Sequence, residues 1–405
     1  MPELLPVKQA KDRICNAMPL LPIEQVPLTS AVDRILAADV ISRRTQPPFA
    51  VSAMDGYAVK HRDLRVLPKQ LCIVGEVPAG KKFDKTISSG EAVRIFTGAR
   101  VPDGADTIVI QENTTRDGNF VVVNEGQAEF GKFIRPAGLD FSSGEKLLEA
   151  PKKLTARDIG LVASMNVPWL KVRKKPNIAL LATGDEIVMP GDPCNENQIV
   201  SSNVIGLHAL IDKHGGQPID LGIARDDAES LLTLAKGGLS CDLLITTGGA
   251  SVGDHDLVKS VLVKIGLEVD FWRIAMRPGK PLIFGKIDSV PLLGLPGNPV
   301  SVQLLYAFIV KPLILKLLGA PLKKISAEKL KTNFSMIKKT KRLEWLRVSK
   351  KFINNEYVIV KHPKQGSGMI SSISYSDGIV EIPEHVSSIK KGDIFDYYDF
   401  DKLFS

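Results

Sequence analysis

The sequence predicts a multidomain α/β protein built around a doubly wound parallel sheet. An all-β insert domain, a discontinuous and mostly helical domain, and a small C-terminal β domain accompany it. Between residues 175 and 320, apolar strand patterns alternate with amphipathic helix patterns, which is typical of a parallel sheet covered by helices. Short β-branched runs broken by glycine fill residues 43–144, and strand patterns return after residue 320. The chain has 405 residues, more than one hydrophobic core normally holds.

Helices are predicted on both sides of the β-rich insert. The stretch "SAVDRILAADVI" (residues 30–41) places Val32, Ile35 and Leu36 on one helical face behind a plausible Ser30 N-cap. The stretch "TARDIGLVASMNV" (residues 155–167) has Thr155 as N-cap and Asp158 at the capping-box position. Because these helical pieces flank the β-rich insert of residues 43–144, we expect residues 1–42 and 145–174 to form one discontinuous domain.

The remaining elements follow in order along the chain. Strands are predicted for the apolar runs of the α/β region, at residues 177–183, 218–224, 241–247 and 269–275. Helices are predicted between and after them, at residues 202–216, 226–238, 256–266 and 298–319. The last domain, residues 321–405, shows short strand patterns at residues 343–349, 357–363 and 378–384.

The bulk properties narrow the classes of function. The formal net charge is +8, which suits nucleic acid, anionic surfaces or oxyanionic small molecules. No basic motif interleaved with aromatic residues is present, so a solvated lysine-rich surface is the better interpretation than nucleic-acid binding. The longest apolar run, Leu304–Val310, meets Lys311 and Pro312 too early to span a membrane. The N-terminus has no signal-peptide pattern, and the four scattered cysteines indicate free thiols in a reducing cytoplasm.

Polar or glycine-rich segments follow the predicted strands of the α/β region. Because ligands bind beyond the carboxyl ends of parallel strands, these segments predict a single binding rim. They are "TGDEI" with Glu186, "RDD" with Asp226, "GGASVGDHD" with Gly248, Gly249, Ser251 and Asp256, "MRPGKP" with Arg277, Lys280 and Pro281, and "LPGNPVS" with Pro296, Gly297, Asn298, Pro299 and Ser301.

The residue types on this rim predict an anionic ligand and a cation. Glycine lets the backbone turn tightly, and helix N-termini present N–H groups to anions. The acids Glu186, Asp226 and Asp256 would repel one another and the ligand unless a cation lay among them, and Mg²⁺ prefers such oxygen ligands. Arg277 and Lys280 supply positive donors for an oxyanion. Each segment also has a plainer interpretation, since Asp is a common N-cap and a Gly-Gly pair is usually only a turn; their convergence is the stronger signal.

The β insert holds a second unusual stretch, "PPFAVSAMDGYAV" (residues 47–59), which contains Asp55. "FTGARVPDGAD" (residues 96–106) adds Thr97, and "FIRPAGLDF" (residues 133–141) adds Asp140. A turn alone seldom needs so many polar residues, although Tyr57 is more often a core residue than a ligand.

With "SAMDGYAV", "TGARVPDGAD", "TGDEI", "TTGGASVGDHD", "MRPGKP" and "GLPGNPVS" in this order, the chain resembles the MoeA/gephyrin family of molybdopterin molybdenumtransferases. The resemblance covers about residues 5 to 400. It implies four domains, with a MogA-like α/β domain and a C-terminal β-barrel, and an elongated homodimer with a composite active site. It also implies insertion of molybdenum from molybdate into adenylylated molybdopterin, with a divalent metal, Mg²⁺, and release of AMP.

The resemblance assigns roles to residues. Glu186, Asp226 and Asp256 correspond to acids at the nucleotide and metal site, and Gly248, Gly249 and Ser251 to a turn that cradles the ligand. Asp55 and Thr97, with Asp140 close by, correspond to positions that the partner subunit supplies. On the molybdate side, the resemblance places Arg277, Lys280, Pro281 and Ser301, with the "LPGNP" residues Pro296 to Pro299 beside them and Arg347 and Ser371 from the last domain.

One position departs from the family pattern, because Ala50 stands where the family usually has Asp after "PPF". Two alternatives stay open: a molybdopterin adenylyltransferase, which shares the α/β domain, and a non-catalytic scaffold like gephyrin. A molybdopterin adenylyltransferase and apo-molybdoenzymes are also expected as protein partners.

Overall fold

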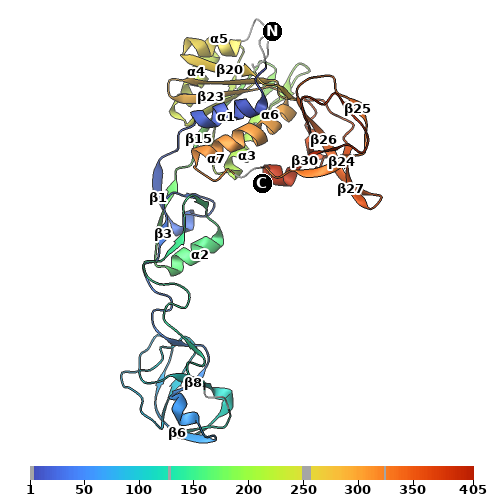
Figure 1. The fold of residues 1–405 in the computed structure, drawn as a ribbon. Helices are drawn as coiled ribbons and strands as arrows, with labels where there is room; N and C mark the ends of the chain where they lie inside the picture. The colour runs from blue at the N-terminus through green and yellow to red at the C-terminus, as the bar shows by residue number, and fades with distance from the viewer. Residues whose placement is uncertain (1–3, 126–128, 249–256, 323–324) are drawn as a thin grey trace.

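The computed structural model describes residues 4–125, 129–248, 257–322 and 325–405. The chain is elongated: an α/β body and a small barrel lie at one end, a narrow stalk follows, and a β-rich lobe lies at the far end (Figure 1). The chain starts in the body, runs down the stalk to the lobe, and returns along the stalk before it builds most of the body. This path makes the stalk depend on pairing between distant segments, such as β1 with β14 and β2 with β13.

The α/β body contains one six-stranded sheet. Its strand order is β18 (Gln217–Ala224), β15 (Asn177–Thr183), β19 (Leu243–Thr247), β23 (Val290–Leu295), β22 (Pro281–Ile287) and β20 (Leu267–Arg273). The first four strands are parallel, as the sequence predicts. β22 was not predicted; it runs antiparallel to both neighbours, so β20 points the same way as the parallel strands again.

Helices cover both faces of this sheet, which makes the body doubly wound as predicted. They are α3 (Asn203–Lys213), α4 (Ala228–Gly237), α5 (Leu257–Lys264), α6 (Pro299–Leu305) and α7 (Lys311–Leu317). Alternate residues of β15 enter different apolar clusters: Ile178 and Leu180 pack in one, Ala179 and Leu181 in the other. A strand that is apolar on both sides is the signature of a sheet buried on both faces.

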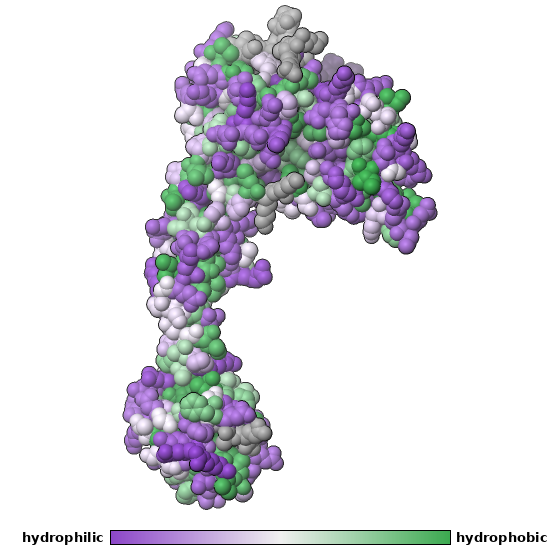
Figure 2. Space-filling model, viewed as in Figure 1, coloured by the Kyte–Doolittle hydropathy of each residue, from purple (hydrophilic) through white to green (hydrophobic). Residues whose placement is uncertain are grey.

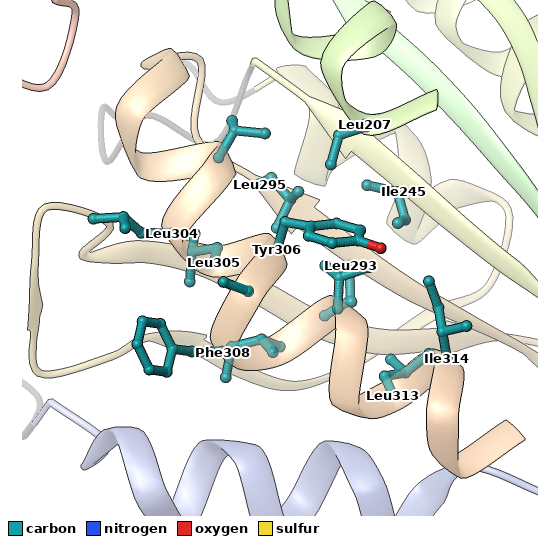
Figure 3. Close-up of a cluster of buried hydrophobic side chains, with 14 of the residues drawn as sticks. Leu207, Ile245, Leu293, Leu295, Leu304, Leu305, Tyr306, Phe308, Leu313 and Ile314 are labelled. Carbon is teal, nitrogen blue, oxygen red and sulfur yellow. The ribbon is translucent and has the colours of Figure 1, made fainter. Parts of the chain in front are cut away.

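The larger apolar cluster surrounds the long C-terminal helix of the body. Figure 3 shows Tyr306 in its centre, near Leu207 of α3 and Ile245 of β19. The helix α1 (Val7–Ala17) packs into the same cluster through Ala10 and Ile14. A π-helical turn (Tyr306–Val310) joins α6 to α7. The span Pro299–Leu317 is long and apolar enough for a membrane helix, but 78% of its most apolar window is buried inside the fold, as expected of a core helix.

The stalk differs from its prediction. A four-stranded sheet with the order β1 (Ile23–Pro27), β14 (Trp169–Arg173), β2 (Ile35–Leu36) and β13 (Lys152–Lys153) lies beside the helix α2 (Ala156–Ser164). The prediction of a helix over residues 30–41 is wrong, because this segment forms β2 and β3 (Val40–Ile41), with Asp33 at a φ of 64° before them. The capping box of Thr155 and Asp158 at the start of α2 is confirmed.

The far lobe is all-β. Its main sheet has the order β8 (Thr107–Ile110), β5 (Gly56–Val59), β7 (Glu91–Ile95), β6 (Lys69–Val77), β10 (Phe120–Val123) and β9 (Thr114–Asp117). Short pairs join β4 (Val51–Ser52) to β11 (Ile134–Arg135), and β3 to β12 (Lys146–Leu148) at the stalk.

The C-terminal domain is a closed five-stranded barrel. Its strands are β26 (Leu343–Ile353), β27 (Glu356–Lys361), β24 (Glu328–Thr332), β30 (Ile394–Asp399) and β28 (Gly378–Ile382), and β28 pairs back with β26. The short strand β21 (Met276–Arg277) of the body adds to this barrel beside β26. β25 (Met336–Ile337) pairs with β29 (Ser388–Ile389), and the helices α8 (Ser371–Ser374) and α9 (Phe400–Phe404) complete the domain. The body also carries the pair β16 (Ile187–Val188) and β17 (Ile199–Val200).

Candidate functional site

The carboxyl ends of five strands of the body lie at one edge of its sheet. β18, β15, β19, β23 and β20 all end there, and the antiparallel strand β22 begins there. The segments that leave this edge carry the residues that the sequence singles out: Asp185 and Glu186, Asp226 and Asp227, Gly248, Pro296 to Pro299, and Arg277 to Lys280. We call this edge the strand-end rim.

The central turns of the strand-end rim are in close contact. Gly248 has a φ of +91°, and a Cβ on it would overlap the carbonyl oxygen of Thr183 at the end of β15. A Cβ on Gly297, after β23, would lie 3.7 Å from the Cα of Gly248. The Nδ2 atom of Asn203, at the start of α3, donates to the Gly297 carbonyl over 2.8 Å. Only glycine fits Gly248 without strain, and it lets this turn pack directly against the end of β15.

The neighbouring acids at one end of the rim have different tasks. Asp227 is the N-cap of α4, and its carboxylate accepts from the backbone N–H of Ser230 at 2.7 Å. Asp185 accepts from the backbone N–H of Asp226 at 3.1 Å and so ties the β15 turn to the β18 turn. The carboxylates of Asp226 and Glu186, in contrast, have no hydrogen-bond or ion-pair partner among the residues that the structure describes. Of the four acids in these two turns, Asp226 and Glu186 are therefore the ones that a ligand or cation can use.

The basic residues lie at the other end of the same rim. Arg277 and Lys280 stand between β20 and β22, and Arg277 is exposed while Lys280 is half-buried. Three strand spacings separate β15 from β22, or about 14 Å at the usual distance between neighbouring strands. The acids thus follow β15 and β18, and the basic residues lie in the connection between β20 and β22, where Arg277 is on β21 and pairs with the barrel strand β26.

The C-terminal barrel contributes a loop to this end. The backbone N–H of Val300 in α6 donates to the Ser367 carbonyl at 3.1 Å, and a Cβ on Gly368 would lie 3.7 Å from Oδ1 of Asn298. This places the loop of residues 364–370 against the start of α6, where the "LPGNP" segment leaves the rim.

Arg347 holds that loop rather than facing solvent. Its side chain is buried, and its guanidinium donates to the Gly366 carbonyl and to the Ser372 hydroxyl, each at 3.1 Å, and to the Lys364 carbonyl at 3.3 Å. Burial lowers the pKa of Arg347 to about 10. Three of its five N–H groups therefore hold the loop, and direct contact between Arg347 and an anion, as the resemblance suggested, stays a prediction. The hydroxyl partner of Arg347 is Ser372, and Ser371 is exposed.

A second constellation lies in the far lobe. Asp55 accepts from both the backbone N–H and the hydroxyl of Thr97, each at 2.7 Å. These bonds, first from the hydroxyl and then from the backbone, together with the charge of Arg94, hold the pKa of the Asp55 carboxyl below its ordinary value. Arg94 lies over the rings of Tyr57 and Phe96, at 5.2 and 5.0 Å from their centroids. Asp140 is exposed on the same lobe.

Within one chain the lobe is remote from the strand-end rim, because the stalk separates them (Figure 1). Asp55 and Thr97 therefore meet each other but do not meet Glu186 or Arg277 of their own chain.

The remaining predicted residues are distributed as follows. Gly249, Ser251 and Asp256 lie outside the residues that the structure describes. Pro281, Pro299 and Lys280 are half-buried at the rim, whereas Pro296 and Ser301 are buried. Among the described residues, no three acidic, histidine or cysteine side chains come together as a metal site.

Three contributors were not identified from the sequence. They are Asn203, which binds Gly297, Arg94, which flanks Asp55, and Glu344, which faces Arg277 over 3.4 Å. Each depends on a contact between distant segments, which a strand or helix pattern does not reveal; Glu344 carried the nearest hint, as an acid within an apolar strand pattern.

The fold defines a multidomain α/β protein with a central doubly wound domain, whose strand-end rim carries the residues that the sequence singles out. Family models agree with this class. "MoeA N-terminal region (domain I and II)" matches residues 5–166, "Probable molybdopterin binding domain" matches residues 179–316, and "MoeA C-terminal region (domain IV)" matches residues 329–400. The chain belongs to the MoeA family.

Individual relatives agree. A molybdopterin molybdenumtransferase of Nostoc is 38% identical over 77% of this chain and 74% of its own length. One of Haemophilus influenzae is 37% identical over 78% of each chain. The crystal structure of a molybdopterin biosynthesis MoeA protein from Pyrococcus horikoshii superposes with a TM-score of 0.85, at 32% identity over 98% of this chain and 99% of that one.

Proposed function

We propose that this chain is a molybdopterin molybdenumtransferase that takes molybdenum from molybdate and inserts it into adenylylated molybdopterin, with release of AMP. Its family and the names of its relatives make it a transferase of molybdenum cofactor biosynthesis. The observation that carries the finer proposal is the bipartite strand-end rim: acids follow β15 and β18, basic residues flank β22, and a glycine turn lies between them.

Charge explains why such a rim suits this reaction. Adenylylated molybdopterin is a polyanion and molybdate is a dianion, so the two substrates repel each other in a shared site. Arg277 and Lys280 neutralise molybdate at one end, since both present charged N–H donors. The backbone at the Gly248 turn receives the phosphate or pterin portion in the middle. The loop that Arg347 holds closes the molybdate side.

Mg²⁺ fits the donor chemistry of the other end. It commonly takes one or two carboxylates and completes its shell with water and substrate phosphates. Glu186 and Asp226 supply carboxylates without other partners in the described chain, and Asp256 would add a third. When bound, the ion supplies charge neutralisation at the diphosphate as AMP leaves. The acids themselves orient the nucleotide end of the substrate away from Arg277.

We also propose a homodimer in which the lobe of one subunit completes the rim of the other. The Asp55 and Thr97 pair is ordered by two hydrogen bonds yet lies at the far end of the stalk from its own rim. Large apolar side chains are exposed on the stalk and next to it, and Figure 2 shows hydrophobic patches along it. They are Ile23, Val32, Ile41 and Trp169. A second subunit that covers this surface would bring its Asp55, Thr97 and Asp140 to the rim.

The proposed location is the cytoplasm, where the four free cysteines stay reduced.

The test is to incubate the purified protein with adenylylated molybdopterin, Mg²⁺ and molybdate and to follow AMP by chromatography. We expect AMP release that depends on molybdate and molybdenum that stays with the pterin. AMP release of equal rate without molybdate would contradict the proposal. Consumption of ATP with unmodified molybdopterin would instead identify an adenylyltransferase.

A further inference from the structure

The contact between the body and the barrel contains a buried acid that the proposed reaction does not yet use. Glu344 lies on β26, directly opposite Arg277 in the register of β21 and β26. Its side chain is 5% exposed, whereas that of Arg277 is 45% exposed. Oε1 of Glu344 lies 3.4 Å from the Arg277 guanidinium, and Oε2 is buried with no hydrogen-bond partner among the described residues.

Such an arrangement is costly for stability alone. A buried carboxylate with an unpaired oxygen carries a desolvation penalty that one partner at 3.4 Å does not offset well. An apolar residue at this place in the barrel wall would avoid the penalty, and Leu346, the next residue on the same face of β26, is apolar and buried. The acid is therefore better explained by what it does to Arg277.

Cations other than Arg277 also lie near Glu344. Nη1 of Arg342 donates to the Met276 carbonyl at 3.2 Å. Burial lowers the pKa of Arg342, the charge of Arg277 lowers it further, and the charge of Glu344 acts to raise it. Burial also lowers the pKa of Lys338, while Glu344 acts to raise it. Nζ of Lys338 donates to the Pro383 carbonyl. Glu344 thus lies near three cations, Arg277, Arg342 and Lys338, of which Arg277 is exposed; a second acid, Glu384, also acts to raise the pKa of Lys338.

We propose that Glu344 is a positioning residue for molybdate binding, and this rests on the proposed function of Arg277. The carboxylate holds one edge of the guanidinium from the barrel side, so that the remaining N–H groups of Arg277 point toward the rim. A guanidinium has five N–H donors in a fixed plane, so fixing one edge fixes the direction of the others. Glu344 itself touches no substrate.

The direction in which one substitution changes the KM for molybdate separates this role from simple electrostatics. Glu344→Gln keeps the shape and removes the charge. If Glu344 positions Arg277, the KM for molybdate rises by about five- to tenfold, the scale of one weakened charge-assisted hydrogen bond, while the KM for adenylylated molybdopterin stays the same. If only charge matters, the loss of a negative group near an anion site lowers the KM for molybdate. A lowered or unchanged KM overturns the proposal.

Three further variants complete the experiment. Glu381→Gln is the matched control: it neutralises another acid of the barrel, one that accepts from Trp345 Nε1 at 3.0 Å, and we expect the wild-type KM for molybdate. Glu344→Asp keeps the charge but withdraws it by one methylene, so we expect a rise in KM, and it replaces Glu344→Gln if that variant does not fold. When Glu344→Gln is added to the Arg277→Ala variant, we expect no further rise in the KM for molybdate. If the effects of the two substitutions on KM multiply in the double variant, Glu344 acts independently of Arg277.

Failure of the proposed function can be told apart from failure of the positioning role of Glu344. If wild-type AMP release does not depend on molybdate, the proposed function fails. Calorimetric titration of wild type and Glu344→Gln with molybdate alone still tests the positioning role, which is overturned if the two proteins bind molybdate equally.

Discussion

At the scale of single residues, the structure separates acids that look equivalent in the sequence. Asp226 and Asp227 are neighbours, and either could have been the N-cap of α4. Asp227 caps the helix, and the carboxylate of Asp226 has no partner in the described chain. One is therefore structural and the other is available to the ligand.

This division predicts opposite phenotypes. We expect Asp226→Asn to leave the melting temperature unchanged and to lower AMP release by roughly 100-fold, the scale of losing one electrostatic group from an active site. We expect Asp227→Ala to destabilise the protein by about 1 kcal/mol through the lost cap and to retain most activity. Thermal unfolding and AMP release, measured on both variants, check this, and a stable, inactive Asp227→Ala would reverse the assignment.

The pair of Asp55 and Thr97 predicts a pH dependence. Because Thr97 holds the pKa of Asp55 below its ordinary value, Asp55 stays ionised to more acidic pH than a free carboxyl. Thr97→Val removes the hydroxyl donor, so the pKa of Asp55 rises and the acid limb of the kcat/KM profile moves to higher pH. Thr97→Ser keeps a hydroxyl and should retain the wild-type profile. A Val variant with an unshifted acid limb would show that ionised Asp55 is not required.

The sequence predicts the positions and contacts of these single residues only in part. The placement of Glu186, Asp226, Arg277 and Lys280 after strands was predictable, because the rule that parallel strands end at one edge needs no coordinates; their roles stay predictions. The pairing of Glu344 with Arg277 and the burial of Arg347 were not predictable this way. Both depend on how the barrel packs on the body, and the local pattern of β26 carries no information on that packing.

At the scale of elements, local signals succeeded where the element is local. The capping box of Thr155 and Asp158 lies within four residues and predicted α2. The prediction of a helix over residues 30–41 was wrong because β2 and β3 take their partners from residues 146–172, more than 100 positions away. Helical spacing of Ile35 and Leu36 is compatible with either structure, and tertiary pairing decided between them. The π-helical turn at residues 306–310 was also missed, although Pro312 deprives the Phe308 carbonyl of its helical N–H partner.

The loop of residues 364–370, together with Ser372 at the start of α8, gives a prediction at this scale. Arg347→Lys keeps the charge but cannot reach the Gly366 and Lys364 carbonyls and the Ser372 hydroxyl together. We expect faster amide exchange over this loop and a 10- to 100-fold lower kcat/KM, about the cost of a displaced binding segment. Hydrogen exchange by mass spectrometry and molybdate titrations measure both effects. Reduced activity without faster exchange would assign Arg347 a role other than holding the loop.

At the scale of the whole molecule, the elongated shape is the basis of the proposed homodimer. The strand-end rim and the Asp55 lobe occupy opposite ends of one chain (Figure 1), yet the proposed chemistry uses both. The parallel, doubly wound sheet of the body was predictable from alternating patterns, apart from the antiparallel β22. The position of the lobe at the end of a long stalk was not, because the length and direction of the stalk depend on strand pairing between residues 23–41 and 146–173.

A mixing experiment tests the composite site. Asp55→Asn damages the lobe and Asp226→Asn damages the rim, so each homodimer is inactive. In a mixed dimer, one site receives both defects and the other receives neither. An equal mixture allowed to exchange subunits contains half mixed dimers, each with one intact site of two, so activity should recover to about a quarter of wild type. Mixing Glu186→Gln with Asp226→Asn, both on the rim, should recover nothing, since every site keeps one defect. If the first mixture also stays inactive while subunits exchange, each site is built from a single chain, and the long stalk must serve another purpose.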